Sequence, residues 1–167
     1  MYNVNDMVVY GNQGVCEVVK IGTLSMSMVD KKKKYYTLRP IYQREAAVYV
    51  PVDNVTAVMR PVISKTEAED LIRKIPDIDY AWITNEQERE TQYKNALKTC
   101  DCEELVKIIK TLFKRKKTRI DEGKKVTVVD ERYFRQAENQ LYEELAYALN
   151  MDKNEIGDYI NKSIAGK

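Results

Sequence analysis

Four lysines of one predicted helix are spaced so that they fall on a single face of it. This lysine row consists of Lys107, Lys110, Lys114 and Lys117. The row belongs to a basic patch of nine lysines and arginines from Lys107 to Lys125, which suits contact with phosphates, because each neutralised phosphate releases counterions. No arginine motif that reads base edges accompanies the row, so a contact would position nucleic acid without reading its sequence. The other interpretation is a solvated face that balances the acidic helix after Asp130.

The single tryptophan, Trp82, lies next to a predicted helix start, in a polar stretch from Asp79 to Lys98. Two N-cap positions are possible for this helix. Thr84 begins a capping box with Gln87, which puts Trp82 just outside the helix, whereas a cap at Asp79 puts it in the first turn. The side chain either fills a core or forms an exposed apolar wedge. Wedges of this kind enter the minor groove beside a base step and favour bent or unstacked DNA.

The residue types that most enzymes need are absent or badly placed. Histidine is missing, which removes the commonest general base and the usual zinc ligand. No glycine-rich phosphate loop occurs. The adjacent carboxylates Glu103/Glu104 and Glu143/Glu144 are predicted on helix surfaces or caps, where neighbouring side chains point in different directions. We therefore expect no enzyme activity and no cofactor.

The three cysteines give no sign of a metal site or of disulfides. Their number is odd, and Cys100-Asp-Cys102 has no second pair that would complete four metal ligands. We expect ordinary thiols in a reducing cytoplasm. No apolar run approaches the roughly 20 residues that a membrane span needs.

The first 60 residues contain short apolar runs and no helical pattern. The predicted strands are 7–10, 15–21, 35–39, 46–50 and 55–59, with a turn at 11–14 and a solvated hairpin tip at the four lysines 31–34. Five strands with no helix between them cannot form a parallel sheet. They predict a small antiparallel β barrel of the Tudor or SH3 type, a fold that usually binds peptides or strand edges of partners.

The apolar pattern changes to a helical period at Pro61. Helices are predicted after N-caps at Ser64, Asp101, Asp130 and Asp152, in addition to the helix near Trp82. The helix after Asp130 is expected to carry an acidic outer face formed by Glu138, Glu143 and Glu144. The predicted fold class is α+β, with a Tudor-like barrel in residues 1–60 and a bundle of four or five helices in residues 61–167.

Several motifs in this order resemble the CarD/CdnL family of bacterial transcription regulators. The opening Asp6-Met-Val-Val-Tyr10 and its following glycine turn are similar to the start of that family. Tyr35-Tyr-Thr-Leu38 and Val48-Tyr-Val-Pro-Val-Asp-Asn54 resemble its third and fourth strands. Leu97-Lys-Thr-Cys-Asp101 and Glu104-Leu-Val-Lys-Ile-Ile-Lys-Thr-Leu112 resemble its central helices. The resemblance extends over nearly the whole chain.

The resemblance implies a function that composition does not. The Tudor-like domain would bind the β subunit of RNA polymerase, and the helical domain would contact promoter DNA in the minor groove at the upstream edge of the bubble. A tryptophan wedge would stabilise the open complex. The DNA-binding residues implied are Trp82, Arg89, Lys107, Lys110, Lys114 and Lys117. The polymerase-binding residues implied are Tyr35, Arg39, Tyr49 and Pro51.

Two positions depart from the family pattern. Counting back from Leu97, family members place their tryptophan near Glu86, one helical turn after Trp82. Some members have arginine where this chain has Tyr49, although an aromatic ring there still suits packing against a partner's strand edge. The alternative function is a protein-interaction adaptor with an SH3/Tudor-like barrel and no contact with DNA. In either case we expect a cytoplasmic monomer with no membrane contact.

Overall fold

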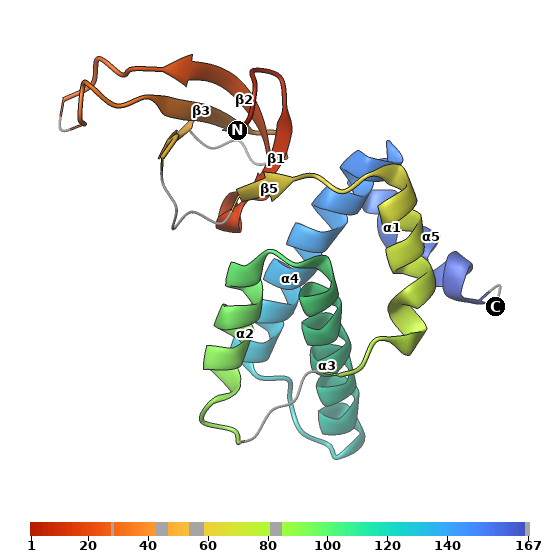
Figure 1. Cartoon of the computed structure of the whole chain (residues 1–167). Coiled ribbons are helices and arrows are strands. Elements are labelled where there is room, and N and C mark those ends of the chain that lie inside the picture. The colour runs from red at the N-terminus through yellow and green to blue at the C-terminus, as the bar shows by residue number, and fades with distance from the viewer. Residues whose placement is uncertain (28, 43–46, 54–58, 81–84, 166–167) are drawn as a thin grey trace. The chain divides into compact units, whose positions relative to one another are not determined.

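The chain folds into two compact units, Met1–Val62 and Ile63–Lys167. The computed structural model describes residues 1–27, 29–42, 47–53, 59–80 and 85–165. Figure 1 shows the strands of the first unit in red to yellow and the helices of the second in yellow-green to blue. The predicted α+β class, with strands first and helices after, is confirmed.

The first unit is a five-stranded antiparallel sheet in the order β4-β3-β2-β1-β5. The strands are β1 (Met7–Tyr10), β2 (Val15–Gly22), β3 (Tyr35–Pro40), β4 (Val48–Pro51) and β5 (Met59–Pro61). The first three predicted strands are confirmed. The fourth begins at Val48, two residues later than predicted. Only Met59 of the predicted fifth strand lies within the described residues.

Local sequence explains the turns of this sheet. The β1–β2 turn contains a short 3-10 helix, η1 (Gly11–Gln13), and its glycines Gly11 and Gly14, at the start of η1 and directly after it, have φ of 45° and 71°. Such left-handed φ values favour glycine. The lysines 31–34 are exposed, as predicted. The core of the sheet is formed by Val8, Cys16, Val18, Tyr36, Leu38 and Val50.

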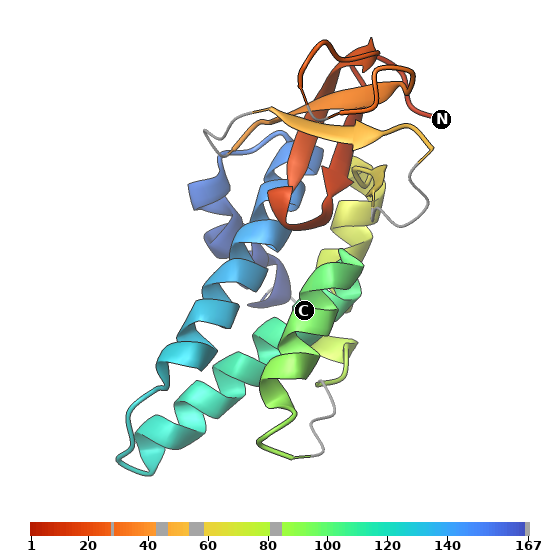
Figure 2. The same ribbon diagram turned by 90° about the vertical axis from the view of Figure 1, so that its left-hand side faces the viewer.

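Within its described residues, the second unit has five α-helices and a short 3-10 turn, η2 (Ile75–Asp77). The helices are α1 (Lys65–Lys74), α2 (Arg89–Thr99), α3 (Cys102–Asp121), α4 (Val128–Leu149) and α5 (Lys153–Ala165). Helix α4 packs against each of the other four, so it is the centre of the bundle. Figure 2 shows α3 and α4, the two longest helices, lying antiparallel and joined by a short turn.

Three of the predicted N-caps are confirmed. Asp152 precedes α5, and its Oδ1 accepts a hydrogen bond of 2.8 Å from the N–H of Asn154. The hydroxyl of Ser64 accepts a hydrogen bond of 3.1 Å from the backbone N–H of Glu67. The carboxylate of Asp101 accepts from the N–H groups of Glu103 and Glu104, at 2.8 and 3.3 Å. Each side chain satisfies backbone donors that the first helical turn leaves free.

Two predicted helix starts are wrong. Helix α4 is capped by Thr127, whose hydroxyl accepts from the N–H of Asp130, so Asp130 is no cap. Helix α2 begins at Arg89, and neither Asp79 nor Thr84 starts it. Instead Oδ1 of Asn85 accepts from the N–H of Glu88 at 2.8 Å, which forms a non-helical turn before the helix.

The predicted acidic outer face of α4 is also wrong for two of its three members. Glu143 and Glu144 are buried, with exposed fractions of 3% and 2%. Glu143 pairs with Nζ of Lys153 at 3.2 Å, whereas Glu144 accepts from the N–H of Ile63 at 3.0 Å. Buried carboxylates require such partners, and these come from positions far away in the sequence.

Among the helices in the described ranges, none is long and apolar enough to cross a membrane.

Candidate functional site

The four predicted polymerase-binding residues share one face of the sheet. Side chains alternate along a strand, and Tyr36, Leu38 and Val50 point into the core. Their neighbours in β3 and β4 therefore point to the opposite face, which we call the outer face. Its members from the predicted set are Tyr35, Arg39, Tyr49 and Pro51.

The strand register brings these residues together. Tyr35 is paired with Pro51 across the β3–β4 ladder, and Thr37 is paired with Tyr49. Tyr49 is 40% exposed, whereas Tyr35 is 9% exposed. Arg39 forms an ion pair of 2.5 Å with Glu17, its register partner in β2, and the guanidinium side chain remains 63% exposed. The outer face thus presents an aromatic ring and an oriented cation.

Strand β4 lies at one end of the sheet order, and within the described residues it pairs only with β3. An edge strand of this kind has free backbone groups to which a partner strand can bind. Next to Tyr49 the loop after β2 forms a pocket of about 660 Å³ that is lined by Lys20, Lys31 and several hydroxyl side chains. Edge and outer face together form a surface suited to a protein partner.

The lysine row lies on one continuous helix, α3, as its spacing predicted. Lys114 and Lys117 are exposed. Lys107 pairs with Glu104 at 3.2 Å, and this contact raises the pKa of Lys107. Nζ of Lys110 donates to the backbone carbonyls of Ile75 and Ile78. Lys114 and Lys117 of the row are therefore exposed, whereas the ammonium groups of Lys107 and Lys110 are engaged by a carboxylate and by backbone carbonyls.

Tyr80 lies against the lysine row. Its ring is 50% exposed, and the Nζ atoms of Lys114 and Lys110 lie 4.6 and 5.2 Å from the ring centroid. These distances are within the range of cation–π attraction. Trp82 and its neighbours 81, 83 and 84 lie outside the described residues, so the structure gives the positions of the flanking Tyr80 and Asn85 only.

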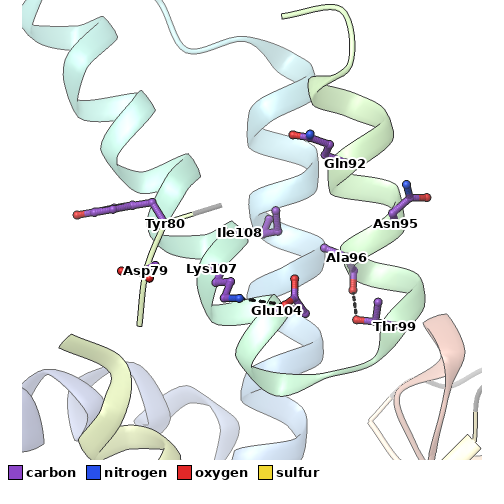
Figure 3. A pocket seen from close by; sticks show the side chains of 9 residues that line it. All are labelled: Asp79, Tyr80, Gln92, Asn95, Ala96, Thr99, Glu104, Lys107 and Ile108. Carbon is purple, nitrogen blue, oxygen red and sulfur yellow. Dashed lines mark hydrogen bonds and ion pairs between the residues drawn. The ribbon is translucent and has the colours of Figure 1, made fainter. Parts of the chain in front are cut away.

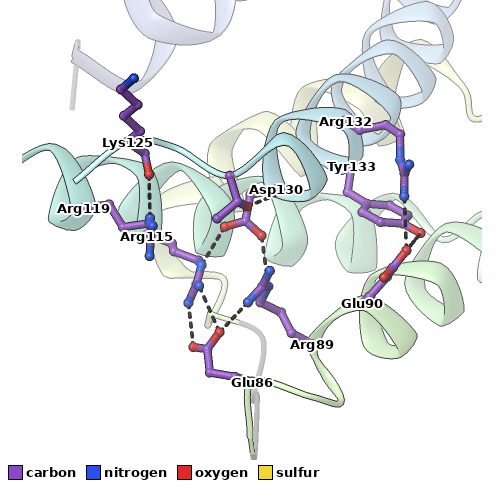
Figure 4. A network of polar contacts seen from close by, with 10 residues as sticks. Glu86, Arg89, Glu90, Arg115, Arg119, Lys125, Asp130, Arg132 and Tyr133 are labelled. Atoms are coloured by element: carbon purple, nitrogen blue, oxygen red, sulfur yellow. Dashed lines mark hydrogen bonds and ion pairs between the residues drawn. The ribbon is translucent and has the colours of Figure 1, made fainter.

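A buried carboxylate organises the other side of α3 (Figure 4). Asp130 is 3% exposed, and its two oxygens face the Nε atoms of Arg89 and Arg115, at 3.0 and 2.6 Å. Arg115 also donates from both terminal nitrogens to Glu86, at 2.7 and 2.9 Å. Glu86 makes a further ion pair with Arg89. We call these four residues the arginine–carboxylate network.

The electrostatics of this network are mutually reinforcing. The hydrogen bond from Arg115 is the main reason that the pKa of Glu86 is lowered. Burial lowers the pKa of Arg115, but hydrogen bonds to Glu86 and Asp130 outweigh burial and raise it. Burial also raises the pKa of Tyr93, and the negative charge of Asp130 adds to this effect. The pairing of Arg115 with Glu86 thus favours the charged form of both side chains.

The network accounts for Arg89. Its side chain is only 14% exposed, and both of its ion-pair partners lie within the protein. The predicted contact of Arg89 with DNA stays a prediction, but the position of its guanidinium group is set by Asp130 and Glu86. The sequence predicted no role for Tyr80 or Glu86, and it placed Arg115 only in the basic patch 107–125. The i, i+3 spacing of Glu86 and Arg89 was the one local signal for this part of the network.

A pocket of about 750 Å³ lies between α2, α3 and the segment at Tyr80 (Figure 3). Ala96 and Ile108 are its aliphatic lining residues, and the other lining residues carry polar groups. The lining residues are Asp79, Tyr80, Gln92, Asn95, Ala96, Thr99, Glu104, Lys107 and Ile108. Within the part of the chain that the structure describes, no group of three or more acidic or cysteine side chains is arranged to hold a metal ion.

Comparisons with known proteins agree with this two-unit arrangement. The family model for the CarD-like/TRCF RID domain matches residues 2–63, and the model for the CarD C-terminal domain matches residues 79–161. The chain belongs to the CarD/CdnL family. CarD proteins are non-enzymatic transcription factors that interact with RNA polymerase, so this chain is a transcription regulator of that kind. A comparison with curated proteins finds no match.

Each of the surfaces described above lies within one of the two matched family domains. The outer face and the β4 edge lie in the unit that matches the CarD-like/TRCF RID domain. The lysine row, Tyr80 and the arginine–carboxylate network lie in the unit that matches the CarD C-terminal domain. This chain is therefore a CarD-family protein whose helical unit carries the lysine row on α3.

Proposed function

We propose that this CarD protein stabilises the promoter open complex. The sheet unit binds the β subunit of RNA polymerase through the outer face and the β4 edge. The helical unit contacts promoter DNA in the minor groove at the upstream edge of the bubble. The observation that carries the proposal is the match of both CarD family models, in order, to a chain with a lysine row on α3.

The mechanism follows from differential affinity. A wedge that binds only unstacked base steps, together with cations that bind the flanking phosphates, prefers the open over the closed promoter. Lys114 and Lys117 are the exposed cations of the row and are assigned the phosphate contacts. Trp82, the single tryptophan, is assigned the wedge. The protein acts as a cytoplasmic monomer with RNA polymerase and needs neither cofactor nor metal.

The test is the lifetime of open complexes after addition of a competitor. Trp82→Ala is expected to shorten this lifetime by about tenfold, since loss of one aromatic contact with a base costs roughly 1–3 kcal/mol. Tyr147→Ala, which removes a 40% exposed aromatic ring from α4, is the matched control and should leave it unchanged. If the Trp82→Ala variant is folded and its open complexes live as long as those of the wild type, Trp82 is not the wedge.

The adaptor remains the second candidate, because several predicted DNA-binding cations have partners within the protein. Arg89, Lys107 and Lys110 are each engaged by carboxylates or carbonyls. The adaptor would be favoured if the protein binds the β subunit and its effect on the lifetime of open complexes does not depend on salt concentration. A steep dependence on salt would favour the contact with DNA.

A further inference from the structure

Helix α3 holds both ends of the segment that carries Trp82. Before the segment, Nζ of Lys110 donates to the carbonyl of Ile75 at 2.9 Å and to that of Ile78. After the segment, both terminal nitrogens of Arg115 donate to the carboxylate of Glu86. Lys110 and Arg115 are only five positions apart on α3, so one rigid helix determines where the chain enters and leaves this segment.

The first anchor has two parts. The ammonium of Lys110 donates to the carbonyl of Ile78 and to that of Ile75, which also accepts from the N–H of Ile78, and these bonds fix the path of the chain up to Ile78. Two residues later, the ring of Tyr80 lies beneath the ammonium groups of Lys110 and Lys114. A lysine engaged in this way by carbonyls has fewer donors left for phosphates, because an ammonium has three.

The second anchor is a bidentate clamp on a buried support. Both terminal nitrogens of Arg115 donate to the carboxylate of Glu86, and its Nε donates to Asp130 at 2.6 Å. The side chain of Asp130 is 4% exposed, whereas that of Glu86 is 66% exposed. The arginine is thus fixed by a buried charge and holds an exposed one. Planar bidentate pairs of this kind fix direction as well as distance.

We propose that Lys110 and Arg115 are positioning residues that set the two ends of the Trp82 segment. In this role they orient the segment for its contact with DNA and do not themselves contact DNA. The part of the proposal that concerns DNA rests on the proposed function, but the positioning does not. The exposure of Glu86 is central: an exposed side chain adds little to global stability, so its clamp acts locally.

The fluorescence of Trp82 reports on this segment directly, because the chain has no other tryptophan. Glu86→Gln keeps the size of the side chain and removes the charge that Arg115 binds. We expect stronger acrylamide quenching and lower anisotropy of Trp82, with the anchored population reduced about threefold, the factor that suits an ion pair with one exposed partner. Lys110→Met, which removes the first anchor, should act in the same direction.

Glu131→Gln is the matched control, because it removes an exposed ion pair with Arg135 on α4 and leaves the contacts of Lys110, Arg115 and Asp130 in place. It should leave the fluorescence of Trp82 unchanged, and circular dichroism should show that all three variants are folded. Wild-type quenching and anisotropy in both Glu86→Gln and Lys110→Met would overturn the positioning role.

A double-mutant cycle separates this proposal from the proposed function. Glu86→Gln should shorten the open-complex lifetime in the wild-type background and have no further effect in the Trp82→Ala background, since the two residues act through one contact. Additive effects would overturn the positioning role. If Trp82→Ala alone has no effect, the proposed function fails, and the fluorescence result still decides the positioning.

Discussion

Nε of Arg115 donates a hydrogen bond of 2.6 Å to the buried carboxylate of Asp130. These residues belong to α3 and α4, and Arg89 brings α2 to the same carboxylate. The carboxylate is therefore the point at which three helices of the bundle meet. An ion in such a position is tolerated because two opposite charges compensate its loss of hydration.

Removal of this carboxylate should destabilise the helical unit strongly. Asp130→Ala leaves two arginines without their shared partner, and breaking a buried pair in this way costs about 3–5 kcal/mol. Urea denaturation followed by circular dichroism measures the loss. Glu131→Ala, at the next and exposed position, is the control and should change the free energy of unfolding by less than about 0.5 kcal/mol. Equal effects of the two substitutions would show that Asp130 is not an essential support.

The sequence predicted correctly those features that depend on residues close together in the chain. Ser64 and Asp101 cap helices because each side chain bonds backbone groups two or three residues away, and a capping pattern contains all that is needed for this. The strands of the sheet unit follow from alternation and turn residues in the same way. The lysine row was predictable because helical spacing alone places its members on one face.

The failures have causes that lie far away in the sequence. Asp130 fits a cap pattern, but Thr127 caps the helix and Asp130 is drawn inward by Arg89 and Arg115. Glu144 looks like a surface residue until Ile63, 81 positions earlier, is found donating to it. Arg115 and Glu86 are 29 positions apart. No local pattern reports such a pair, and for this reason the anchors of the Trp82 segment were missed.

The exposed lysines should account for the salt dependence of DNA binding. Replacing either Lys114 or Lys117 with alanine should reduce the slope of log K against log salt concentration by about 1, because each phosphate contact releases close to one counterion. Affinity of the complex with RNA polymerase for promoter DNA, measured over a series of salt concentrations, gives the slope. Lys162→Ala on α5 is the control for a loss of charge alone. A slope that neither row variant changes would remove these lysines from the interface.

The outer face of the sheet should be sensitive at Tyr49. The ring is 40% exposed on an edge strand, and aromatic side chains in such positions are often the strongest contacts of an interface. Tyr49→Ala is expected to weaken binding to the β subunit about tenfold, which calorimetry can measure. Tyr147→Ala, with a ring of equal exposure in the helical unit, should bind normally. Equal affinities would place the polymerase contact elsewhere on the sheet unit.

Stability should depend on pH through Glu143. Burial raises the pKa of this carboxyl group, and the positive charge of Lys153 offsets burial only in part. The folded protein therefore holds this proton more tightly than the unfolded chain. Its contribution to stability is complete below about pH 4, the ordinary range of a glutamate, and is lost as the pH rises through the raised pKa.

Glu143→Gln removes this titration and keeps the shape of the side chain. The variant should gain stability relative to the wild type as the pH rises from about 4 to 7, because the wild type alone must then bury a charge. Urea denaturation at a series of pH values measures the difference. Lys153→Met is the informative companion: without the ammonium 3.2 Å away, the pKa of Glu143 should rise further and the wild-type loss should extend to higher pH. A difference that is constant over this range, or of opposite sign, would mean that Lys153 compensates the buried carboxylate fully.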